Sequence, residues 1–500
     1  MKPKKSRSNY LLYLILTIAF LLLSYHINKP FIGHHDWNGA FWGTVARNYV
    51  FYINQAIPFI GIQKEPPYYT QLIYYQNYTP LMPILFTITS LFLGVSELSL
   101  RLTTVLFSIL MLLYIYKIAR LLYSEKVALL ATILATVTPM FLYFGKLPDH
   151  EPIITSLITI TFYYYLKLKT YNKKTYIIFL SFLTLTLLES WSGFIFLATL
   201  ILFGYFGQKK KLRFFLPPIF LGIFVVLLHL MFLYFFYGQL GVSTFLTSGI
   251  GRISVRESVT YVVKYNFLQF LSTEARYFVV YFTRILAIAT FLWVIKFLFD
   301  LKNKRISQSD KQLLPLGVFA IAFIIIFNNL AFIHDYKLYL LLPFIAIASA
   351  QMLWTIFGFL PRSKLTPFLI AIFLVLIVIG VFTERLKFLK TQLDTSFNTP
   401  GYELGIYLNK ATPPGSKIFV DSRQFHSFYD VFELYYSNRS VTGYDLTLAS
   451  FKKDIAHSPY KYLVLVDGRT TDPKLQKYLD QNYKANRQKN FTVYNLQKNI

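Results

Sequence analysis

Cysteine is absent from the 500-residue chain, so disulfide bonds and thiolate metal sites are excluded. Cysteine usage therefore does not indicate whether the protein faces an oxidising or a reducing compartment. No glycine-rich loop for a nucleotide is present, and the C-terminal part has neither a nucleophile elbow nor a cluster of metal ligands. No motif therefore points to a bound nucleotide.

Charged side chains are scarce, and acidic ones especially so. They make up 15% of the chain, whereas an average soluble domain has about 25%. The 50 Lys and Arg residues outnumber the 23 Asp and Glu residues, which gives a formal charge of +27. The basic residues fall in short clusters between apolar stretches and not on one soluble face, so we expect no nucleic-acid partner. Membrane orientation and anionic lipid headgroups explain this distribution better.

Long apolar stretches dominate the rest of the sequence, and 55% of all residues are hydrophobic. Many stretches have about 17 to 24 residues, the length that a helix needs to cross hydrocarbon. They predict a mainly α, polytopic membrane protein with about 11 transmembrane helices. The basic N-terminus and its apolar span lack a small-residue cleavage site, so we interpret them as a retained first helix that starts in the cytoplasm. The predicted spans are Tyr10–Tyr25, Leu100–Leu122, Val127–Phe144, Pro152–Leu168, Tyr176–Leu188, Gly193–Phe206, Phe214–Tyr237, Tyr277–Phe299, Leu313–Phe332, Leu338–Leu360 and Pro367–Phe382.

Whether the short apolar segment Pro80–Gly94 crosses the membrane determines the membrane orientation of all later spans. If this segment does not cross, nearly all dense basic clusters lie on one side, as the positive-inside rule requires. We therefore interpret it as a juxtamembrane or re-entrant helix on the outer side. The clusters are the N-terminus, Lys117–Lys126, Lys167–Lys174, Lys209–Arg213, Lys296–Lys311 and Arg362–Lys364.

Five polar motifs from distant parts of the chain then fall on the outer face. Helix-end residues placed at random would fall on both faces about equally, so the asymmetry predicts a common outer cavity. The motifs contain His34, His35 and Asp36; Asp149, His150 and Glu151; Glu189 and Trp191; Arg252 and Arg256; and His334 and Asp335.

The composition changes after about Lys387 to that of a soluble domain. The strand-like segments KIFVD, YLVLV and FTVYNL alternate with the helix-like segments GYELGIYLNK and DPKLQKYLDQNY. We therefore predict a transmembrane domain at residues 1–387, whose outer loop at 28–99 carries juxtamembrane helices, and a small extracytoplasmic α/β domain at residues 388–500. We assign the second domain a structural or acceptor-recognition role.

Asp36 is the best candidate for a general base. It is flanked by His34, His35 and Trp37 after the first span. An ionised carboxylate at the membrane surface can take a proton from an incoming hydroxyl or amine. Asp is also a common helix N-cap, which is the alternative role for the segment Gly39–Ile57, and the two roles are compatible.

The segment Asp149-His150-Glu151 supplies a second acidic element. Glu151 precedes a proline that suits a first helical turn, so ordinary N-terminal capping is the alternative. On the same side as Asp36, a carboxylate here would orient the acceptor or help hold a divalent ion. Mg²⁺ and Mn²⁺ need several oxygen ligands, and only two or three are indicated. We therefore assign no metal ligand and expect that no cofactor is required. Binding of Mg²⁺ or Mn²⁺ is left as an alternative.

Arg252 and Arg256 are four residues apart in the predicted polar outer loop Gly238–Glu274, so on a helix they would share a face. Arg binds phosphate bidentately and keeps its charge, so the pair suits the phosphate of a lipid carrier. His334, Lys337 and Tyr339, at the outer end of a later span, would join the same phosphate site. For Lys337 alone, snorkelling of the ammonium group to the interface is the preferred interpretation.

The order of these motifs resembles the GT-C membrane glycosyltransferases, specifically the family 39 and 83 group that includes protein O-mannosyltransferases and the lipid A aminoarabinose transferase. The shared features begin with an outer aspartate after the first span, an ARN-like helix, a proline-rich juxtamembrane segment and SELSLRL before the next span. They continue with Glu151-Pro152, Trp191 and the motif HDYKLYLLLP. Members usually have His or Lys before Pro-Pro, where this chain has Tyr78-Thr79-Pro80, so the substrate contact at this segment is undefined.

The resemblance implies transfer of a sugar from a polyprenyl-phosphate donor in the membrane to a lipid, glycan or protein acceptor on the extracytoplasmic face, with inversion. It implies that Asp36 is the catalytic base and that Glu151 is the second acidic residue of the site. We predict that Asp149, beside Glu151, is a catalytic residue as well. The substrate-binding residues that we predict are His35, Trp37, Arg47, His150, Trp191, Arg252, Arg256, His334, Asp335 and Tyr339.

Two other functions remain open. A flippase or transporter for lipid-linked sugars would have charged residues near the middle of spans, whereas the acids here lie at span ends. No internal repeat of the kind found in secondary transporters is apparent. An O-antigen-type polymerase would use arginines in a large outer loop, which Arg252 and Arg256 fit, but the Asp36 cluster would then have no role.

Overall fold

The computed structural model describes residues 7–52, 77–168, 172–207, 211–253, 265–361, 363–396, 399–421, 430–443, 446–455, 460–466, 470 and 472–499. The chain divides into two compact units, each described here by itself. The helical unit comprises Met1–Ile27, Gln76–Met82 and Arg101–Leu393. The mixed unit comprises Asn28–Tyr75, Pro83–Leu100 and Asp394–Ile500. The division falls within α3 (Leu81–Leu93) and α4 (Glu97–Leu122).

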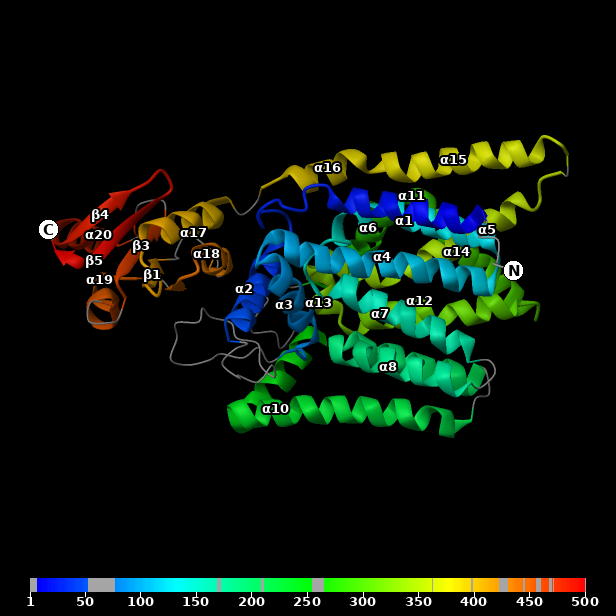
Figure 1. Ribbon diagram of the computed structural model, residues 1–500, viewed down its shortest axis with the longest axis horizontal. Coiled ribbons are helices and arrows are strands. Elements are labelled where there is room, and N and C mark those ends of the chain that lie inside the picture. Colours follow the sequence, from blue (N-terminus) through cyan, green and yellow to red (C-terminus); the bar gives the residue numbers. More distant parts are fainter. Residues whose placement is uncertain are drawn as a thin grey trace. The chain divides into compact units, whose positions relative to one another are not determined.

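The helical unit is a bundle of helices that run alongside one another (Figure 1). With most of α4, its elements are α1 (Arg7–Ser24), α5 (Glu125–Val137), α6 (Pro139–Phe144), α7 (His150–Lys167), α8 (Lys173–Glu189), α9 (Ser192–Leu202), the π-helix η2 (Phe203–Gly207), α10 (Leu212–Ile253), α11 (Phe267–Lys302), α12 (Gln308–Ile326), α13 (Asn328–Ile333), the 3₁₀-helix η4 (Asp335–Leu341), α14 (Leu342–Phe357), α15 (Thr366–Glu384) and α16 (Leu386–Asp394). Helix α7 packs on α8, α14 on α5 and α11, and α9 on α12.

Every predicted span contains a helix, but several spans are interrupted. In the span Val127–Phe144, Thr138 separates α5 from α6, because a residue before proline disfavours the helical conformation. Its hydroxyl accepts a hydrogen bond from Phe141 N–H (3.2 Å) and so caps α6. The span Leu313–Phe332 is divided at Phe327 between α12 and α13. The spans therefore mark helical segments correctly, although not every one is a single continuous helix.

In the described part of the chain, six helical stretches are long and apolar enough to cross a membrane. They are Glu97–Leu122, Leu216–Ile253, Phe267–Lys302, Gln308–Ile326, Asp335–Phe357 and the stretch that begins at Thr366. The chain is a multi-pass, mainly α-helical membrane protein, and the number of eleven crossings stays a prediction. Helix α3 has 13 residues, or about 20 Å, short of the ~30 Å of hydrocarbon. This length agrees with a juxtamembrane position for Pro80–Gly94.

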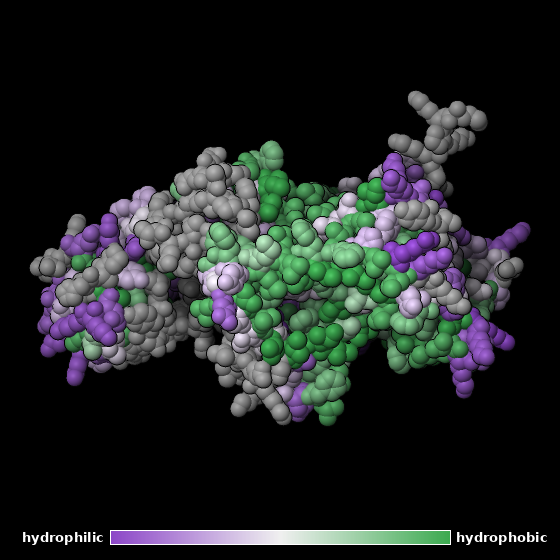
Figure 2. All heavy atoms as spheres, turned by 90° about the horizontal axis from the view of Figure 1, so that it is seen from below, coloured by the Kyte–Doolittle hydropathy of each residue, from purple (hydrophilic) through white to green (hydrophobic). Residues whose placement is uncertain are grey.

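The surface of the helical unit suits lipid over the length of its helices. Figure 2 shows hydrophobic side chains in a broad green area over these helices, and hydrophilic side chains gathered near the end that carries the N-terminus. Phe220 of α10, Phe291 of α11 and Phe368 of α15 are among the exposed apolar residues. Large apolar side chains are exposed in this number where lipid, not water, is the neighbour.

The basic clusters of several helices lie together at one end of the helical unit. The Lys117 ammonium of α4 lies 5.8 Å from the ring of Tyr163 in α7. The Tyr123 hydroxyl, just after α4, donates to Asp310 at the start of α12 (2.8 Å). The acidic residues Asp149 and Glu189 belong to the opposite ends of α7 and α8. Basic and acidic motifs are thus separated along the helices, as the predicted orientation requires.

In the residues that the structure describes, the predicted outer loop Gly238–Glu274 is mainly helical, which corrects that expectation. Helix α10 continues to Ile253, with a break at Gly238 (φ 61°, ψ −152°) that glycine adopts without strain. Helix α11 begins at Phe267. Arg252 therefore lies in the last turn of α10 and not in an open loop.

The mixed unit combines helices from the predicted outer loop with a five-stranded sheet. Besides most of α3 and the start of α4, its elements are α2 (Asp36–Tyr52), α17 (Thr399–Ala411), β1 (Lys417–Asp421), α18 (Asp430–Ser437), β2 (Ser440–Gly443), α19 (Leu448–Ser450), the π-helix η5 (Phe451–Ile455), β3 (Tyr462–Val466), α20 (Pro473–Asn482), β4 (Tyr483–Arg487) and β5 (Phe491–Asn499). The strand order is β2-β1-β3-β5-β4. Strand β1 is parallel to both β2 and β3, whereas β5 is antiparallel to both β3 and β4.

The sheet buries apolar side chains on both faces. In β1, Ile418 and Val420 point to a core shared with α17 and α18, whereas Phe419 points to a second core shared with α20. The three predicted strands and both predicted helices of this part are confirmed. The domain boundary near Lys387 stays a prediction, and the contacts additionally group residues of the outer loop 28–99 with the α/β part (α17 to β5).

Candidate active site

Buried charged side chains cluster at the start of α7 in the helical unit. Asp149 is the N-cap, and its Oδ1 accepts a hydrogen bond from His150 N–H (2.8 Å). Asp149, His150 and Glu151 are all buried. A helix N-terminus favours negative charge, but buried carboxyl groups are costly unless other groups pair with them. The ion-pair and hydrogen-bond partners of these side chains therefore indicate the role of the cluster.

Lys337 supplies a positive charge to this cluster from η4. Its side chain is buried, and its ammonium group forms an ion pair with Glu151 through Oε1. Burial alone would raise the pKa of the Asp149 carboxyl, but the charges of Lys337 and His150 lower it. The interpretation of Lys337 as a snorkelling side chain is therefore wrong, because the ammonium group is paired with an acid of another helix.

His150 forms a second pair with Glu189, the last residue of α8. His150 Nδ1 lies 3.0 Å from Glu189 Oε1, and both side chains are buried. A carboxylate that orients an imidazole is an arrangement suited to proton transfer. We placed Glu189 on the outer face from the sequence but gave it no role. The available signal was an acid at the end of an apolar run, where an ionisable group needs a partner.

The segment around Tyr78 lies against this cluster. The rings of Tyr78 and His150 are 4.2 Å apart, and the Arg252 guanidinium lies 5.8 Å from the Tyr78 ring. Trp191 Nε1 donates to the carbonyl of Asn77 (2.7 Å). Tyr78, where the chain departs from the family pattern, thus connects Arg252 to the acidic cluster, and Trp191 anchors its segment.

The other predicted residues of the helical unit lie on or next to η4. Asp335 accepts a hydrogen bond from the Tyr281 hydroxyl through Oδ2. The Tyr339 hydroxyl lies 3.0 Å from Ser108 Oγ, and the side chain is fully buried in the core. The His334 ring lies 5.1 Å from the Tyr336 ring. The short 3₁₀-helix η4 therefore carries Asp335, Lys337 and Tyr339, and His334 precedes it.

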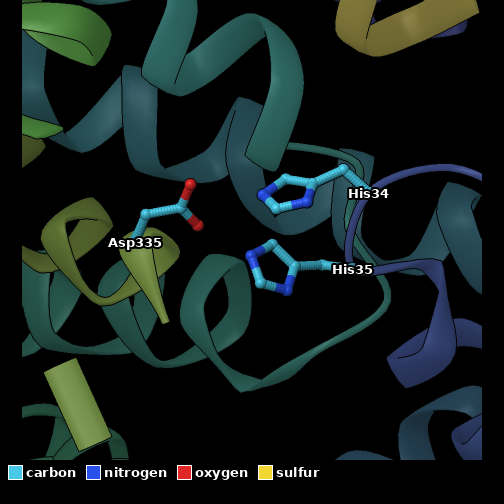
Figure 3. Close-up of side chains that lie close together, drawn as sticks. All are labelled: His34, His35 and Asp335. Carbon is cyan, nitrogen blue, oxygen red and sulfur yellow. The ribbon is translucent and has the colours of Figure 1, made fainter. Parts of the chain in front are cut away.

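Asp36 belongs to the mixed unit, where it begins α2. Its Oδ2 accepts hydrogen bonds from the N–H groups of Ile32 (3.1 Å) and Gly33 (2.8 Å). His35 has φ 61°, a left-handed conformation that is uncommon for residues other than glycine. The rings of His34 and His35 face each other with centroids 3.8 Å apart (Figure 3). The carboxylate is therefore held by the loop before the helix, and this loop is strained next to it.

Two further predicted residues lie along α2. The indole of Trp37 stacks on Phe41 one turn later, with centroids 5.2 Å apart. Arg47 donates through Nη1 to the carbonyl of Tyr435 (2.7 Å) and through Nη2 to that of Leu434 (2.9 Å). Arg47 therefore joins α2 to α18, and its substrate-binding role stays a prediction.

The predicted site residues thus fall into two groups. The helical unit brings together Asp149, His150 and Glu151 with Arg252, Trp191, Lys337 and Glu189, and carries His334, Asp335 and Tyr339. The mixed unit carries Asp36, His35, Trp37 and Arg47. Arg256 lies outside the described residues. The convergence of the two groups on one cavity stays a prediction.

The acidic cluster contains two carboxylate oxygens that can accept hydrogen bonds from a ligand. Among the described residues, no partner is found for Glu151 Oε2 or for Glu189 Oε2, and both atoms are buried. Buried polar atoms are nearly always satisfied, so these two oxygens suit the hydroxyl groups of a ligand or ordered water. The arrangement can bind a polyhydroxylated group and exchange protons with it.

Fold and site together define a polytopic membrane protein with a buried acid–base cluster at one end of its helical bundle. Residues 77–235 match the family described as dolichyl-phosphate-mannose-protein mannosyltransferase. No curated protein is similar enough in sequence to be matched to this chain.

Three solved structures are similar in fold. ArnT from Cupriavidus metallidurans bound to undecaprenyl phosphate has a TM-score of 0.66 and 11% identity, over 98% of either chain. The oligosaccharyltransferase of Archaeoglobus fulgidus in the apo form has a TM-score of 0.62 and 14% identity, over 96% of this chain and 73% of that one; it has also been solved with Zn and sulfate. The arabinofuranosyltransferase AftD from Mycobacteria has a TM-score of 0.56 and 11% identity, over 97% of this chain and 40% of that one. The predicted GT-C fold is confirmed.

Proposed function

We propose that this chain is a membrane glycosyltransferase that transfers a sugar from a polyprenyl-phosphate donor to a lipid, glycan or protein acceptor on the extracytoplasmic face. One observation carries the proposal: the buried cluster of Asp149, His150, Glu151, Glu189 and Lys337 lies at a helix end, opposite the basic clusters. A carrier lipid presents its head at this level of the membrane, and a transporter would instead have charges near the middle of its spans.

The reaction is a single displacement at the anomeric carbon. The acceptor oxygen forms a bond to this carbon while the bond to the phosphate oxygen breaks, and its electron pair leaves with the polyprenyl phosphate. The configuration is therefore inverted. Asp36 takes the proton of the acceptor hydroxyl, for which an ionised carboxylate within hydrogen-bond reach is required.

The acidic cluster binds the sugar. Glu151 Oε2 and Glu189 Oε2 accept hydrogen bonds from sugar hydroxyls, and the ion pair with Lys337 holds the Glu151 side chain in place. Arg252, beside Tyr78, lies where a guanidinium can bind the donor phosphate. His334 and Asp335 belong to the same site, and Arg256 is proposed to add to the phosphate contact.

A divalent cation does not fit the cluster of the helical unit well. Glu151 Oε1 is paired with Lys337, Asp149 Oδ1 accepts from backbone N–H, and Glu189 Oε1 pairs with His150. Mg²⁺ or Mn²⁺ needs about six oxygen ligands, and these contacts leave too few. We therefore propose a transfer that requires no metal and assign no step to one, and chelation should leave the rate unchanged.

The proposed orientation has the N-terminus in the cytoplasm and the α/β part outside. Single cysteines can test it because the chain has no native cysteine. Cysteines at Ser190 and Lys210 should be labelled from opposite sides of the membrane. Labelling from the same side would contradict the orientation.

The activity is tested with purified protein and labelled polyprenyl-phosphate sugars, with the appearance of labelled acceptor and of free polyprenyl phosphate as readouts. We expect Glu151→Gln to lower the transfer rate about 100-fold or more. Asp310→Asn is the matched control, because Asp310 is also a buried carboxylate paired with a lysine, Lys296 (3.0 Å), but at the basic end. Equal losses in both variants, or none in either, would contradict the assignment of Glu151.

A further inference from the structure

Within the mixed unit, the α/β part contacts the helix that begins with Asp36. Helix α2 packs against α18, although the two are separated by more than 300 residues. The Arg47 guanidinium donates to the carbonyls of Leu434 and Tyr435 near the end of α18. A cation at the last carbonyls of a helix complements its negative C-terminal dipole. Helix α2 thus caps α18 and is fixed by it.

Two glycines of α2 allow this close packing. A Cβ atom on Gly43 would lie 2.4 Å from the ring of Tyr435, and one on Gly39 would lie 2.4 Å from the ring of Phe31. The rings of Phe31 and Tyr435 also contact each other, with centroids 5.4 Å apart. The loop before α2, the glycine face of α2 and the end of α18 therefore form one packed cluster.

Tyr436 links this cluster to the carboxylate of Asp36. Its hydroxyl accepts a hydrogen bond from Phe31 N–H (2.6 Å) and donates one to Glu97 Oε1 (2.7 Å). Burial, and then the nearby Glu97, raises the pKa of the Tyr436 hydroxyl, so it stays protonated as a donor. The next two N–H groups along the chain, at Ile32–Gly33, both donate to Asp36 Oδ2. Three consecutive peptide groups thus connect Tyr436 to Asp36.

We propose that the α/β part is a positioning element for Asp36, acting through Tyr436 and Arg47 on the loop whose N–H groups hold the carboxylate. A second tether joins the same segments, since Lys29 Nζ donates to the carbonyl of Thr395 (3.1 Å). The proposal rests on the proposed function, in which Asp36 is the base. It predicts that the α/β part controls the rate of the chemical step and not the affinity for the donor.

The test compares two tyrosines of the α/β part. Tyr436→Phe removes the hydroxyl that holds the loop. Tyr494→Phe is the matched control, because the Tyr494 hydroxyl is also bonded to a carboxylate, that of Asp480 (2.8 Å), but its ring belongs to the core shared with α20. We expect Tyr436→Phe to lower kcat about tenfold, because the loss of a hydrogen bond to a charged group corresponds to a factor of about ten in rate. The KM for the donor should change less than about twofold. Tyr494→Phe should leave both parameters as in the wild type.

A second readout does not depend on transfer. A single cysteine at Lys29 reports on the loop, since no native thiol competes for a maleimide. We expect its labelling rate to rise with Tyr436→Phe and to stay unchanged with Tyr494→Phe. Unchanged labelling with Tyr436→Phe would overturn the positioning role even if no transfer activity were found. Faster labelling together with a wild-type kcat would overturn it as well, while leaving the proposed function intact.

Discussion

Two buried carboxylates, each paired with a lysine, lie at opposite ends of the helical unit. At the basic end, Asp310 accepts hydrogen bonds from Tyr123 (2.8 Å) and Lys296 (3.0 Å), one through each oxygen. At the other end, Glu151 pairs with Lys337 through one oxygen, and its second oxygen has no partner among the described residues. A pair whose hydrogen bonds are complete stabilises the bundle, whereas one with a remaining acceptor can receive a ligand. We propose that this difference separates structural from functional charge in this protein.

Removing Lys337 should have the largest effect. Lys337→Met leaves Glu151 buried without its counter-charge, which costs about 3–5 kcal/mol of unfolding free energy, and transfer should be lost. The double variant Lys337→Met with Glu151→Gln should recover most of the stability but no transfer. Thermal unfolding and labelled transfer measure the two effects. A Lys337→Met protein as stable as the wild type would mean that the pair does not compensate a buried charge.

Removing the charge of Glu189 should act mainly on the rate. Glu189→Gln keeps the size of the side chain but supplies no anion to His150 or to the sugar hydroxyls that Glu189 is proposed to bind, so we expect transfer to fall roughly 100-fold. The melting temperature should change little by comparison. A rate within twofold of the wild type would show that His150 and Glu189 are a structural pair.

At the basic end, Asp310→Asn should have the opposite effect, that is, a loss of stability without a loss of transfer rate. The change leaves Lys296 with only Asp300 (2.9 Å) and weakens the bond to Tyr123, so we expect a loss of about 1–3 kcal/mol in stability. The kcat of transfer, measured below the melting temperature, should be that of the wild type. A large fall in kcat would remove the distinction between the two ends.

The smallest effect concerns acid sensitivity at the end of the helical unit that carries the acidic cluster. The pKa of Asp149 is lower in the folded protein than in the unfolded chain, because Lys337 and His150 outweigh burial. The ionised Asp149 therefore stabilises the folded protein at pH values above its pKa in the unfolded chain. This stabilisation is lost as the pH falls through its pKa in the folded protein. Asp149→Asn should flatten the acidic part of the curve of melting temperature against pH. A curve with the wild-type slope would indicate that Asp149 is not stabilised by its neighbours.

Local patterns predicted much of this molecule. Apolar length identified the helices, alternation identified three strands, and the motif Asp149-His150-Glu151 was recognised as an acidic element at a span boundary. Each of these signals is contained within one segment of the sequence. The break between α5 and α6 and the short strands β2 and β4 were missed, because their cues were weaker than those of the neighbouring helices.

The partners of the site residues could not be predicted in the same way. His150 and Glu189 are 39 residues apart, Lys337 and Glu151 are 186 apart, and Phe31 and Tyr436 are 405 apart. Such pairs depend on which helices pack against each other, and no single segment encodes that. For this reason Lys337 was assigned to the interface and the α/β part to a general structural or recognition role.

The central claim is that Asp36 and Glu151 serve one reaction, and a double-mutant cycle tests it most directly. Transfer of labelled sugar is measured for Asp36→Asn, Glu151→Gln and the double variant. If both residues act on the same transition state, the double variant should be about as slow as the slower single variant, because residues that act as a unit are strongly non-additive. Losses that multiply, or a wild-type rate in Asp36→Asn, would contradict the claim.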